Sequence, residues 1–111
     1  MNIMIVDDNA KMRGMIRSFL SKSVQQVVEC ADGNEVLAAY ERHQPDWILM
    51  DVVMKEVDGI TATKALRRSF PEAKVIILTQ YDDTEVRAQA EHAGAVGFVL
   101  KENLSELLRI L

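Results

Sequence analysis

Cysteine, proline and tryptophan are scarce in this sequence. There is 1 cysteine, which excludes an internal disulfide, and Cys30 at the end of an apolar segment is expected to be a buried thiol rather than a nucleophile. The 2 prolines, Pro45 and Pro71, each follow a segment of helical pattern and are expected to end it. The 1 tryptophan, Trp47, begins an apolar run and is expected to pack in the core.

Long hydrophobic runs are also missing. No apolar run approaches the ~20 residues that a membrane-spanning helix needs. The first apolar run begins so close to Met1 that a signal peptide has no room. We therefore expect a cytoplasmic protein without membrane contact, in which this domain lies at the amino terminus.

Positive charge is in deficit, with 13 Lys and Arg against 17 Asp and Glu and a formal net charge of −4. This balance argues against direct contact of this domain with nucleic acid, so any nucleic acid would be bound by another part of the protein. The composition, 49% hydrophobic and 27% charged, is that of a folded globular protein. A chain of 111 residues suits one core, and we expect residues 1–111 to form one domain.

Short apolar runs alternate with amphipathic segments along the chain. Strands are expected at residues 3–6, 24–30, 47–51, 75–79 and 96–100. Helices are expected at residues 9–21, 32–43, 60–70, 82–93 and 103–111. This alternation predicts an α/β fold, with a doubly wound parallel sheet of five strands and five helices on its two faces.

The last helix carries four leucines at helical spacing, expected to face the core: Leu104, Leu107, Leu108 and Leu111. Met12 and Met15 recur at helical spacing near the start of the chain and are expected to be core for the same reason. The last helix ends without a glycine, a polar tail or a cap, which suggests a helix cut short.

Polar side chains follow four of the expected strands, at the end of each. They are Asp7, Asp8, Asp51, Thr79 and Lys101. The carboxyl ends of parallel strands share one edge of the sheet, which is where α/β sheets bind ligands. An acidic residue after a strand can instead be a helix N-cap, which suits Asp8 taken alone. It does not suit Asp51, which apolar residues follow, or a lysine directly after the last strand.

Three crowded carboxylates repel one another unless cations relieve them. Lys101 supplies one positive charge, and oxygen ligands select Mg²⁺ or Mn²⁺ for the rest. A carboxylate beside such an ion, with a lysine and a hydroxyl nearby, can accept a phosphoryl group, because this transfer needs mainly positioning and neutralisation of phosphate oxygens.

The ordered motifs resemble the receiver domain of two-component response regulators over essentially the whole chain. They are Asp7-Asp8, Ile48-Leu49-Met50-Asp51 with Met54 and Asp58-Gly59, Leu78-Thr79, and Gly97-Phe98-Val99-Leu100-Lys101. The resemblance implies a flavodoxin-like sheet of strand order 2-1-3-4-5. It also implies a signalling domain rather than an enzyme, with only self-catalysed phosphorylation and dephosphorylation.

The resemblance assigns roles to the polar residues. Asp51 would be the phosphoacceptor, receiving a phosphoryl group from a histidine kinase or from a small donor such as acetyl phosphate. Asp8 would bind Mg²⁺ directly and Asp7 largely through water, with Asp51 and the backbone carbonyl of Val53 as further ligands. Lys101 would bind a phosphate oxygen.

The resemblance also implies a switch. Thr79 would follow the phosphate and Phe98 would change rotamer behind it, which would alter the surface of the fourth helix, fifth strand and fifth helix. Core packing in a strand is the alternative for Phe98. Homodimerisation through the same surface stays open.

Four residues near the expected site distinguish this chain from common receivers. Gln80 stands where a small residue usually follows the hydroxyl, so it would narrow access to the phosphoryl group or bond to it. Tyr81 and Val53 occupy positions that tune hydrolysis, and their bulk and apolarity predict slow self-dephosphorylation. Glu102 replaces the usual proline after Lys101, which leaves the geometry of that loop open.

The Thr-Gln-Tyr-Asp-Asp run and Lys-Glu in place of Lys-Pro resemble receivers fused to helix-turn-helix output domains of the nitrate-response type. This favours a module of a transcription regulator whose DNA-binding domain would follow Leu111. The alternative is a stand-alone receiver that acts by phosphotransfer or protein binding. A haloacid-dehalogenase-like phosphatase would need two acidic residues two positions apart after the first strand, which Asp7-Asp8-Asn9-Ala10 does not provide.

Overall fold

The computed structural model describes residues 1–111 and has the alternating order that the sequence predicts. Its strands are β1 (Asn2–Val6), β2 (Gln26–Cys30), β3 (Trp47–Met50), β4 (Val75–Thr79) and β5 (Gly97–Leu100). Its α-helices are α1 (Ala10–Leu20), α2 (Val36–His43), α3 (Gly59–Ser69), α4 (Thr84–Ala93) and α5 (Leu107–Ile110), with 3₁₀ segments η1 (Gly33–Glu35) and η2 (Lys101–Glu106). No helix is long and apolar enough to cross a membrane.

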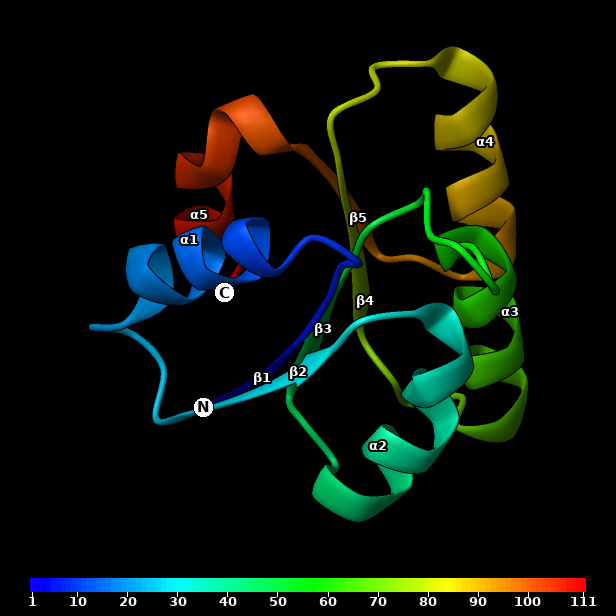
Figure 1. Ribbon diagram of the computed structural model, residues 1–111. Helices are drawn as coiled ribbons and strands as arrows, with labels where there is room; N and C mark the ends of the chain where they lie inside the picture. The colour runs from blue at the N-terminus through cyan, green and yellow to red at the C-terminus, as the bar shows by residue number, and fades with distance from the viewer.

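The five strands form one parallel sheet in the order β2-β1-β3-β4-β5. Helices α1 and α5 lie on one face, and α2, α3 and α4 lie on the other (Figure 1). The predicted fold class, its strand order and its five helices are therefore confirmed.

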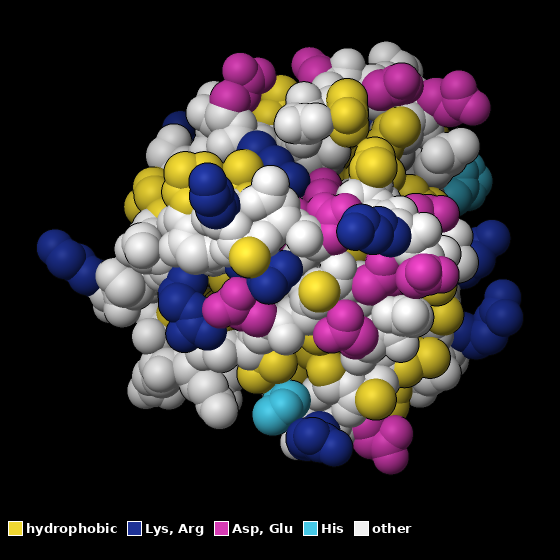
Figure 2. All heavy atoms as spheres, in the orientation of Figure 1, with side chains coloured by type: hydrophobic (Ala, Val, Ile, Leu, Met, Phe, Trp, Pro, Cys, Tyr) yellow, Lys and Arg dark blue, Asp and Glu magenta, His cyan; other side chains and the backbone are white.

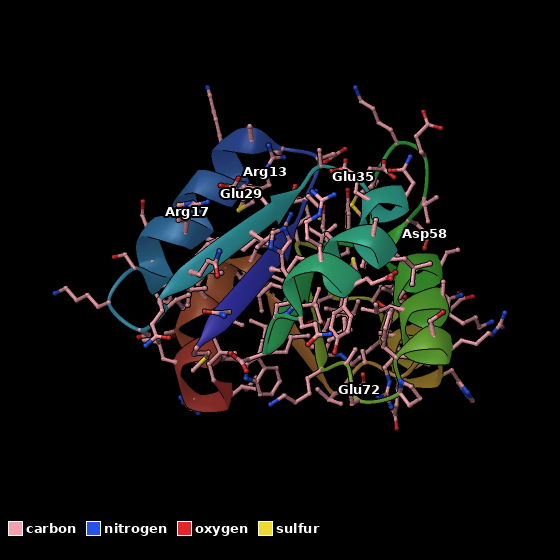
Figure 3. The ribbon with its side chains drawn as sticks, turned by 90° about the horizontal axis from the view of Figure 1, so that it is seen from below. Arg13, Arg17, Glu29, Glu35, Asp58 and Glu72 are labelled. Carbon is pink, nitrogen blue, oxygen red and sulfur yellow. The ribbon has the colours of Figure 1, made fainter.

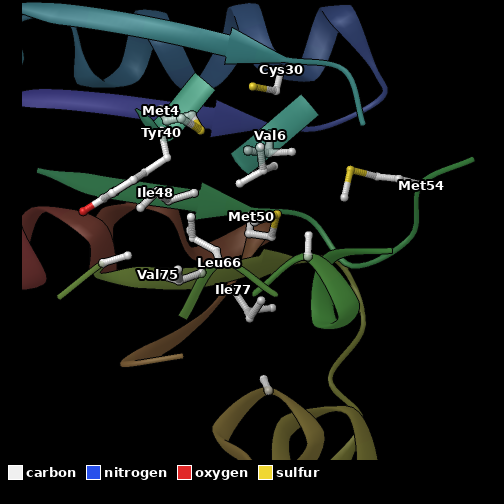
Figure 4. Close-up of a cluster of buried hydrophobic side chains, with 14 residues drawn as sticks. Met4, Val6, Cys30, Tyr40, Ile48, Met50, Met54, Leu66, Val75 and Ile77 are labelled. Carbon is white, nitrogen blue, oxygen red and sulfur yellow. The ribbon is translucent and has the colours of Figure 1, made fainter. Parts of the chain in front are cut away.

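The sheet separates two hydrophobic cores. Alternate side chains of a strand point to opposite faces, so Ile3 and Ile5 pack with α1 and α5, whereas Met4 and Val6 pack with the other three helices (Figure 4). Every residue of β4 is buried, as expected for a central parallel strand covered on both faces.

Local sequence signals set several helix ends. The side chain of Asn9 accepts a hydrogen bond from the Met12 N–H and starts α1, and Asp83 caps α4 through the N–H groups of Glu85 and Val86. Gly94 ends α4 with φ of 102°, a left-handed conformation that glycine adopts without strain.

Two expectations about the core are wrong. Met15 is 51% exposed and Leu108 is 52% exposed. On α1 the buried positions are Ile16 and Leu20, and Met15 lies to one side of the line that they form.

The last helix is also not the continuous α-helix expected from residue 103. Residues 101–106 form the 3₁₀ segment η2, in which Asn103 has a non-helical backbone (φ −122°, ψ 48°). Residues three positions apart align in a 3₁₀ segment, so Leu104 and Leu107 lie on one side of the chain and Leu108 lies off that side. Of the four leucines only Leu107 is fully buried, while Leu104 and Leu111 are partly buried against the core.

Cys30 is a buried free thiol, as the sequence predicts. Burial raises its pKa to about 11, so the reactive thiolate is disfavoured at neutral pH.

Candidate functional site

A hollow of about 200 Å³ opens at the carboxyl ends of the strands. Its lining combines residues from four loops: Asp7, Asp8, Asn9, Asp51, Val53, Gln80, Tyr81 and Lys101. Figure 2 shows acidic side chains near the middle of this face, between basic and hydrophobic ones. The structure thus brings together seven of the nine residues for which the sequence suggested a role in the site or its switch, and adds Asn9, for which it suggested none.

The three carboxylates of this hollow lie close enough to share one ion. Asp7, Asp8 and Asp51 each offer an oxygen, and these oxygens lie within 4.8 Å of one another. Asp7 and Asp51 are buried, whereas Asp8 is exposed. An all-oxygen, trianionic donor set that is open to solvent on one side fits a hard divalent cation such as Mg²⁺, which keeps some of its water ligands.

Lys101 joins two of these carboxylates. Its Nζ lies 2.8 Å from Asp7 Oδ2 and 3.3 Å from Asp51 Oδ1. Burial lowers the pKa of Lys101, but the hydrogen bond to Asp7 and the charge of Asp51 outweigh burial, so the pKa is raised above its ordinary value. The lysine therefore stays charged and neutralises part of the acidic cluster.

Asp51 lies just past β3, between the sheet and the loop that leads to α3. Its Oδ1 accepts a hydrogen bond from the Val52 N–H at 2.9 Å, so this oxygen makes both the backbone and the lysine contact. Burial raises the pKa of Asp51, Lys101 lowers it, and Asp7 raises it further, with a net upward shift. Ionised Asp51 is thus a costly buried charge that a cation would stabilise.

The loop after Asp51 is closed by a glycine. The Gly59 N–H donates to the Val52 carbonyl at 2.8 Å. A Cβ at Gly59 would lie 1.8 Å from the carbonyl oxygen of Asp51, so only glycine permits this approach. The hydrogen bond from Gly59 holds the peptide between Val52 and Val53 in place, next to the candidate phosphoacceptor Asp51.

Asp32 also holds this loop through hydrogen bonds, although the sequence suggested only a helix N-cap for it. Its Oδ1 accepts from the N–H groups of Asn34 and Val57, and its Oδ2 accepts from the Glu56 N–H at 2.8 Å. The hydrogen bond from the Glu56 N–H lowers the pKa of Asp32, and those from the other N–H groups lower it further, which outweighs the opposing effect of burial. Contacts to residues 24 and 25 positions later leave no local signal in the sequence.

The two remaining candidates do not line the hollow. Thr79 is fully buried at the end of β4, and its hydroxyl oxygen accepts from the Tyr81 N–H at 3.3 Å. Phe98 is half-buried on β5, with the guanidinium of Arg87 over its ring at 4.2 Å from Cζ to the centroid. The roles assigned to these two residues stay predictions.

The fold and this acidic site define the class of protein. The family model for the response regulator receiver domain matches residues 3–111, and the chain belongs to this family.

Known relatives include regulators of two kinds. The chain is 39% identical over 110 residues to the uncharacterized transcriptional regulatory protein YhcZ of Bacillus subtilis, a match that covers 97% of this chain and 51% of YhcZ. It is 38% identical over 100 residues to the chemotaxis protein CheY of Bacillus subtilis, covering 89% of this chain and 83% of CheY. The chain therefore spans about half the length of the first relative and most of the second.

A solved structure agrees with these matches. The crystal structure of a two-component response regulator of the LuxR family from Aurantimonas sp. SI85-9A1 superposes with a TM-score of 0.90 at 31% identity, covering 97% of this chain and 79% of that chain. The resemblance to receivers of transcription regulators, inferred from the sequence, is thereby confirmed.

Proposed function

We propose that residues 1–111 form one receiver domain, in the cytoplasm, that accepts a phosphoryl group on Asp51 from a histidine kinase. The observation that carries this proposal is the buried contact of Lys101 with both Asp7 and Asp51 beside the exposed carboxylate of Asp8. One cation is built into the site, and two further positive charges would balance three carboxylates.

The chemistry requires little of the protein beyond positioning. A carboxylate oxygen of Asp51 forms the new bond to phosphorus, and the bond between phosphorus and the donor's imidazole nitrogen breaks. Asp51 Oδ1 is already engaged by the Val52 N–H and by Lys101, so we assign the attack to Oδ2. Lys101 then moves its hydrogen bond from the carboxylates to an oxygen of the transferred group.

The metal ligands would be Asp7, Asp8, Asp51 and the Val53 carbonyl. When bound, Mg²⁺ supplies neutralisation of the developing phosphate charge. Val53, Gln80 and Tyr81 lie on the rim of the hollow. The side chains of Val53 and Tyr81 would restrict the approach of water, and Gln80 would narrow access to the phosphoryl group or bond to it. This position supports the prediction of slow self-dephosphorylation.

The switch would run from Thr79 to Phe98. The Thr79 hydroxyl would turn toward a phosphate oxygen, which would break its contact with the N–H of Tyr81, a residue that lines the hollow. Movement of this loop would release space for the Phe98 ring and alter the surface of α4, β5 and α5, which would also be the surface of a homodimer. The consequence would be a changed affinity for an output domain or effector.

The output is most consistent with transcription. The match to half of a transcriptional regulatory protein favours a DNA-binding domain elsewhere in the full protein, and the net charge of −4 argues that this domain itself does not bind DNA. The match to most of CheY supports the second candidate, a stand-alone receiver that acts on another protein. The length of the encoded protein separates the two.

Intact mass spectrometry tests the proposal. After incubation with acetyl phosphate and Mg²⁺, we expect a single phosphoryl adduct on the parent chain. The adduct should be absent from Asp51→Asn and absent when a chelator removes Mg²⁺. If the parent stays unmodified by acetyl phosphate and also by a histidine-phosphorylated kinase domain, the chain is not a working phosphoacceptor.

A further inference from the structure

Arg13 contacts the backbone of the acidic cluster from outside the hollow. Its Nη1 donates a hydrogen bond to the carbonyl oxygen of Asp7 at 2.6 Å, and its Nε pairs with Glu29 Oε1 at 2.8 Å. The arginine side chain is 17% exposed, so its direction is fixed by these contacts. A planar guanidinium can serve two acceptors at a fixed angle, which a lysine cannot do.

Glu29, the second partner of Arg13, is itself anchored. Arg17 donates to Glu29 Oε2 through Nη2 at 2.7 Å and through Nε at 3.0 Å. In Figure 3, Arg13 and Arg17 come from α1 and lie on either side of Glu29 from β2. Arg17 and then Arg13, against an opposing effect of burial, lower the pKa of Glu29, so the carboxylate stays charged at neutral pH. The network ties α1 to the edge of the sheet.

Both backbone polar groups of Asp7 are therefore held by hydrogen bonds. The Asp7 N–H donates to the Cys30 carbonyl at 3.1 Å, and the Asp7 carbonyl accepts from Arg13. The next residue, Asp8, is exposed and takes part in none of the ion pairs of the structure. Its carboxylate is therefore placed by the backbone rather than by contacts of its own.

We infer that Arg13 is a positioning residue for cation binding: it fixes the Asp7–Asp8 peptide so that the Asp8 carboxylate faces Asp7 and Asp51. This inference rests on the proposed function, because it concerns the same metal site. Arg13 touches neither the ion nor the phosphoryl group and acts through the Asp7 carbonyl.

The charge of Arg13 and its hydrogen bond to Asp7 have opposite effects on the affinity for Mg²⁺, so a substitution of Arg13 shows which effect is larger. Arg13 is a cation, so loss of its charge alone would strengthen the binding of a second cation nearby. Loss of the hydrogen bond to Asp7 would loosen the Asp7–Asp8 peptide and weaken binding. Residues that orient metal ligands typically change affinity by about tenfold or more, so we expect positioning to dominate.

The experiment compares Arg13→Ala and Arg13→Lys with Arg17→Ala. The control removes the other arginine that binds Glu29 and leaves the Asp7 carbonyl untouched. Mg²⁺ affinity is measured by titration calorimetry, and the rate of phosphorylation by acetyl phosphate is measured as a function of Mg²⁺ concentration. Thermal midpoints without Mg²⁺ record the change in fold stability separately.

We expect Arg13→Ala to raise the Mg²⁺ dissociation constant about tenfold and Arg13→Lys to raise it severalfold, with Arg17→Ala within about twofold of the parent. The Mg²⁺ concentration for half-maximal phosphorylation should rise by the same factor, while the rate at saturating Mg²⁺ changes less. A purely structural role would lower the thermal midpoint and leave both quantities unchanged. If Arg13→Ala does not fold, the Mg²⁺ dissociation constant of Arg13→Lys tests the inference in its place.

Unchanged or tighter Mg²⁺ binding in the folded Arg13 variants would overturn the inference and leave the proposed function intact. A parent chain that neither binds Mg²⁺ nor becomes phosphorylated would overturn both. Because the parent is measured beside its variants, the two failures are distinguishable.

Discussion

Lys101 Nζ lies 2.8 Å from Asp7 Oδ2, and both side chains are largely buried. The lysine charge therefore stands where it competes with a metal ion for the same carboxylates and where it can reach a transferred phosphoryl group. These two effects have opposite consequences for a variant without the charge.

We predict that Lys101→Met binds Mg²⁺ about fivefold more tightly, because a repelling cation is gone. Phosphorylation of the same variant by acetyl phosphate at saturating Mg²⁺ should slow at least about tenfold, because a donor to the phosphate is lost. Calorimetry and intact mass measure the two quantities. Lys22→Met, at an exposed lysine just past α1, is the control and should change neither. Weaker Mg²⁺ binding in Lys101→Met would contradict the competition between Lys101 and the metal ion for the same carboxylates.

The raised pKa of Asp51 predicts a stability effect. A carboxyl group whose pKa is higher in the folded state contributes stability below its unfolded pKa, about 3.9, and loses it as pH rises through the folded pKa. Asp51→Asn removes this cost. Without Mg²⁺ at pH 7 we expect its thermal midpoint to lie about 2 to 5 °C above that of the parent.

The gain from Asp51→Asn should disappear below about pH 4, where the carboxyl group is protonated in both states. Added Mg²⁺ should reduce the gain, because the ion stabilises the parent. Thermal unfolding followed by circular dichroism at several pH values measures both trends. A lower midpoint for Asp51→Asn at pH 7 would mean that Lys101 more than compensates the buried charge.

Two glycines make a matched pair. A Cβ at Gly59 would lie 1.8 Å from the Asp51 carbonyl oxygen, whereas a Cβ at Gly14, within α1, meets nothing within 4 Å. We predict that Gly59→Ala lowers the free energy of unfolding by more than about 2 kcal/mol and impairs phosphorylation, because the loop after Asp51 must move. Gly14→Ala should instead raise it by about 0.5 to 1 kcal/mol and leave phosphorylation unchanged. Urea denaturation measures the free energy of unfolding of both variants. Equal changes in the two variants would show that the loop after Asp51 accommodates a Cβ at Gly59 without strain.

Tyr81 lies on the rim of the hollow and is 49% exposed. If its ring restricts water near the acyl phosphate, Tyr81→Ala should lose phosphate several times faster than the parent, on the order of fivefold. The decay of the phosphorylated mass after removal of acetyl phosphate measures the rate. Phe19→Ala, at an exposed aromatic residue of α1, is the control for aromatic truncation and should decay as the parent does. An unchanged rate of phosphate loss in Tyr81→Ala would mean that Tyr81 does not shield the acyl phosphate from water.

Local patterns in the sequence were sufficient for the fold and for most of the hollow. Apolar runs such as Val75–Thr79 are readable because a strand buried on both faces must be apolar throughout, and the carboxyl ends of parallel strands share one edge by geometry. That rule alone predicts that Asp7, Asp51 and Lys101 meet, although Lys101 is 94 positions from Asp7 along the chain.

Only the tertiary structure shows which residues are buried by, or hydrogen-bonded to, segments distant in the sequence. Leu108 has the spacing of a core residue, but the folded chain packs the neighbouring Leu107 into the core and leaves Leu108 exposed. Arg13 and Asp32 look like ordinary helix and cap residues, and only the folded chain brings them to the backbone of the Asp7 and Asp51 loops. A hydrogen bond to a backbone group leaves no pattern of residue types, since every residue carries the same carbonyl and nearly every residue the same N–H. The residue pattern was therefore sufficient to identify most of the side chains that line the site, and the packing of distant segments decided what holds them in place.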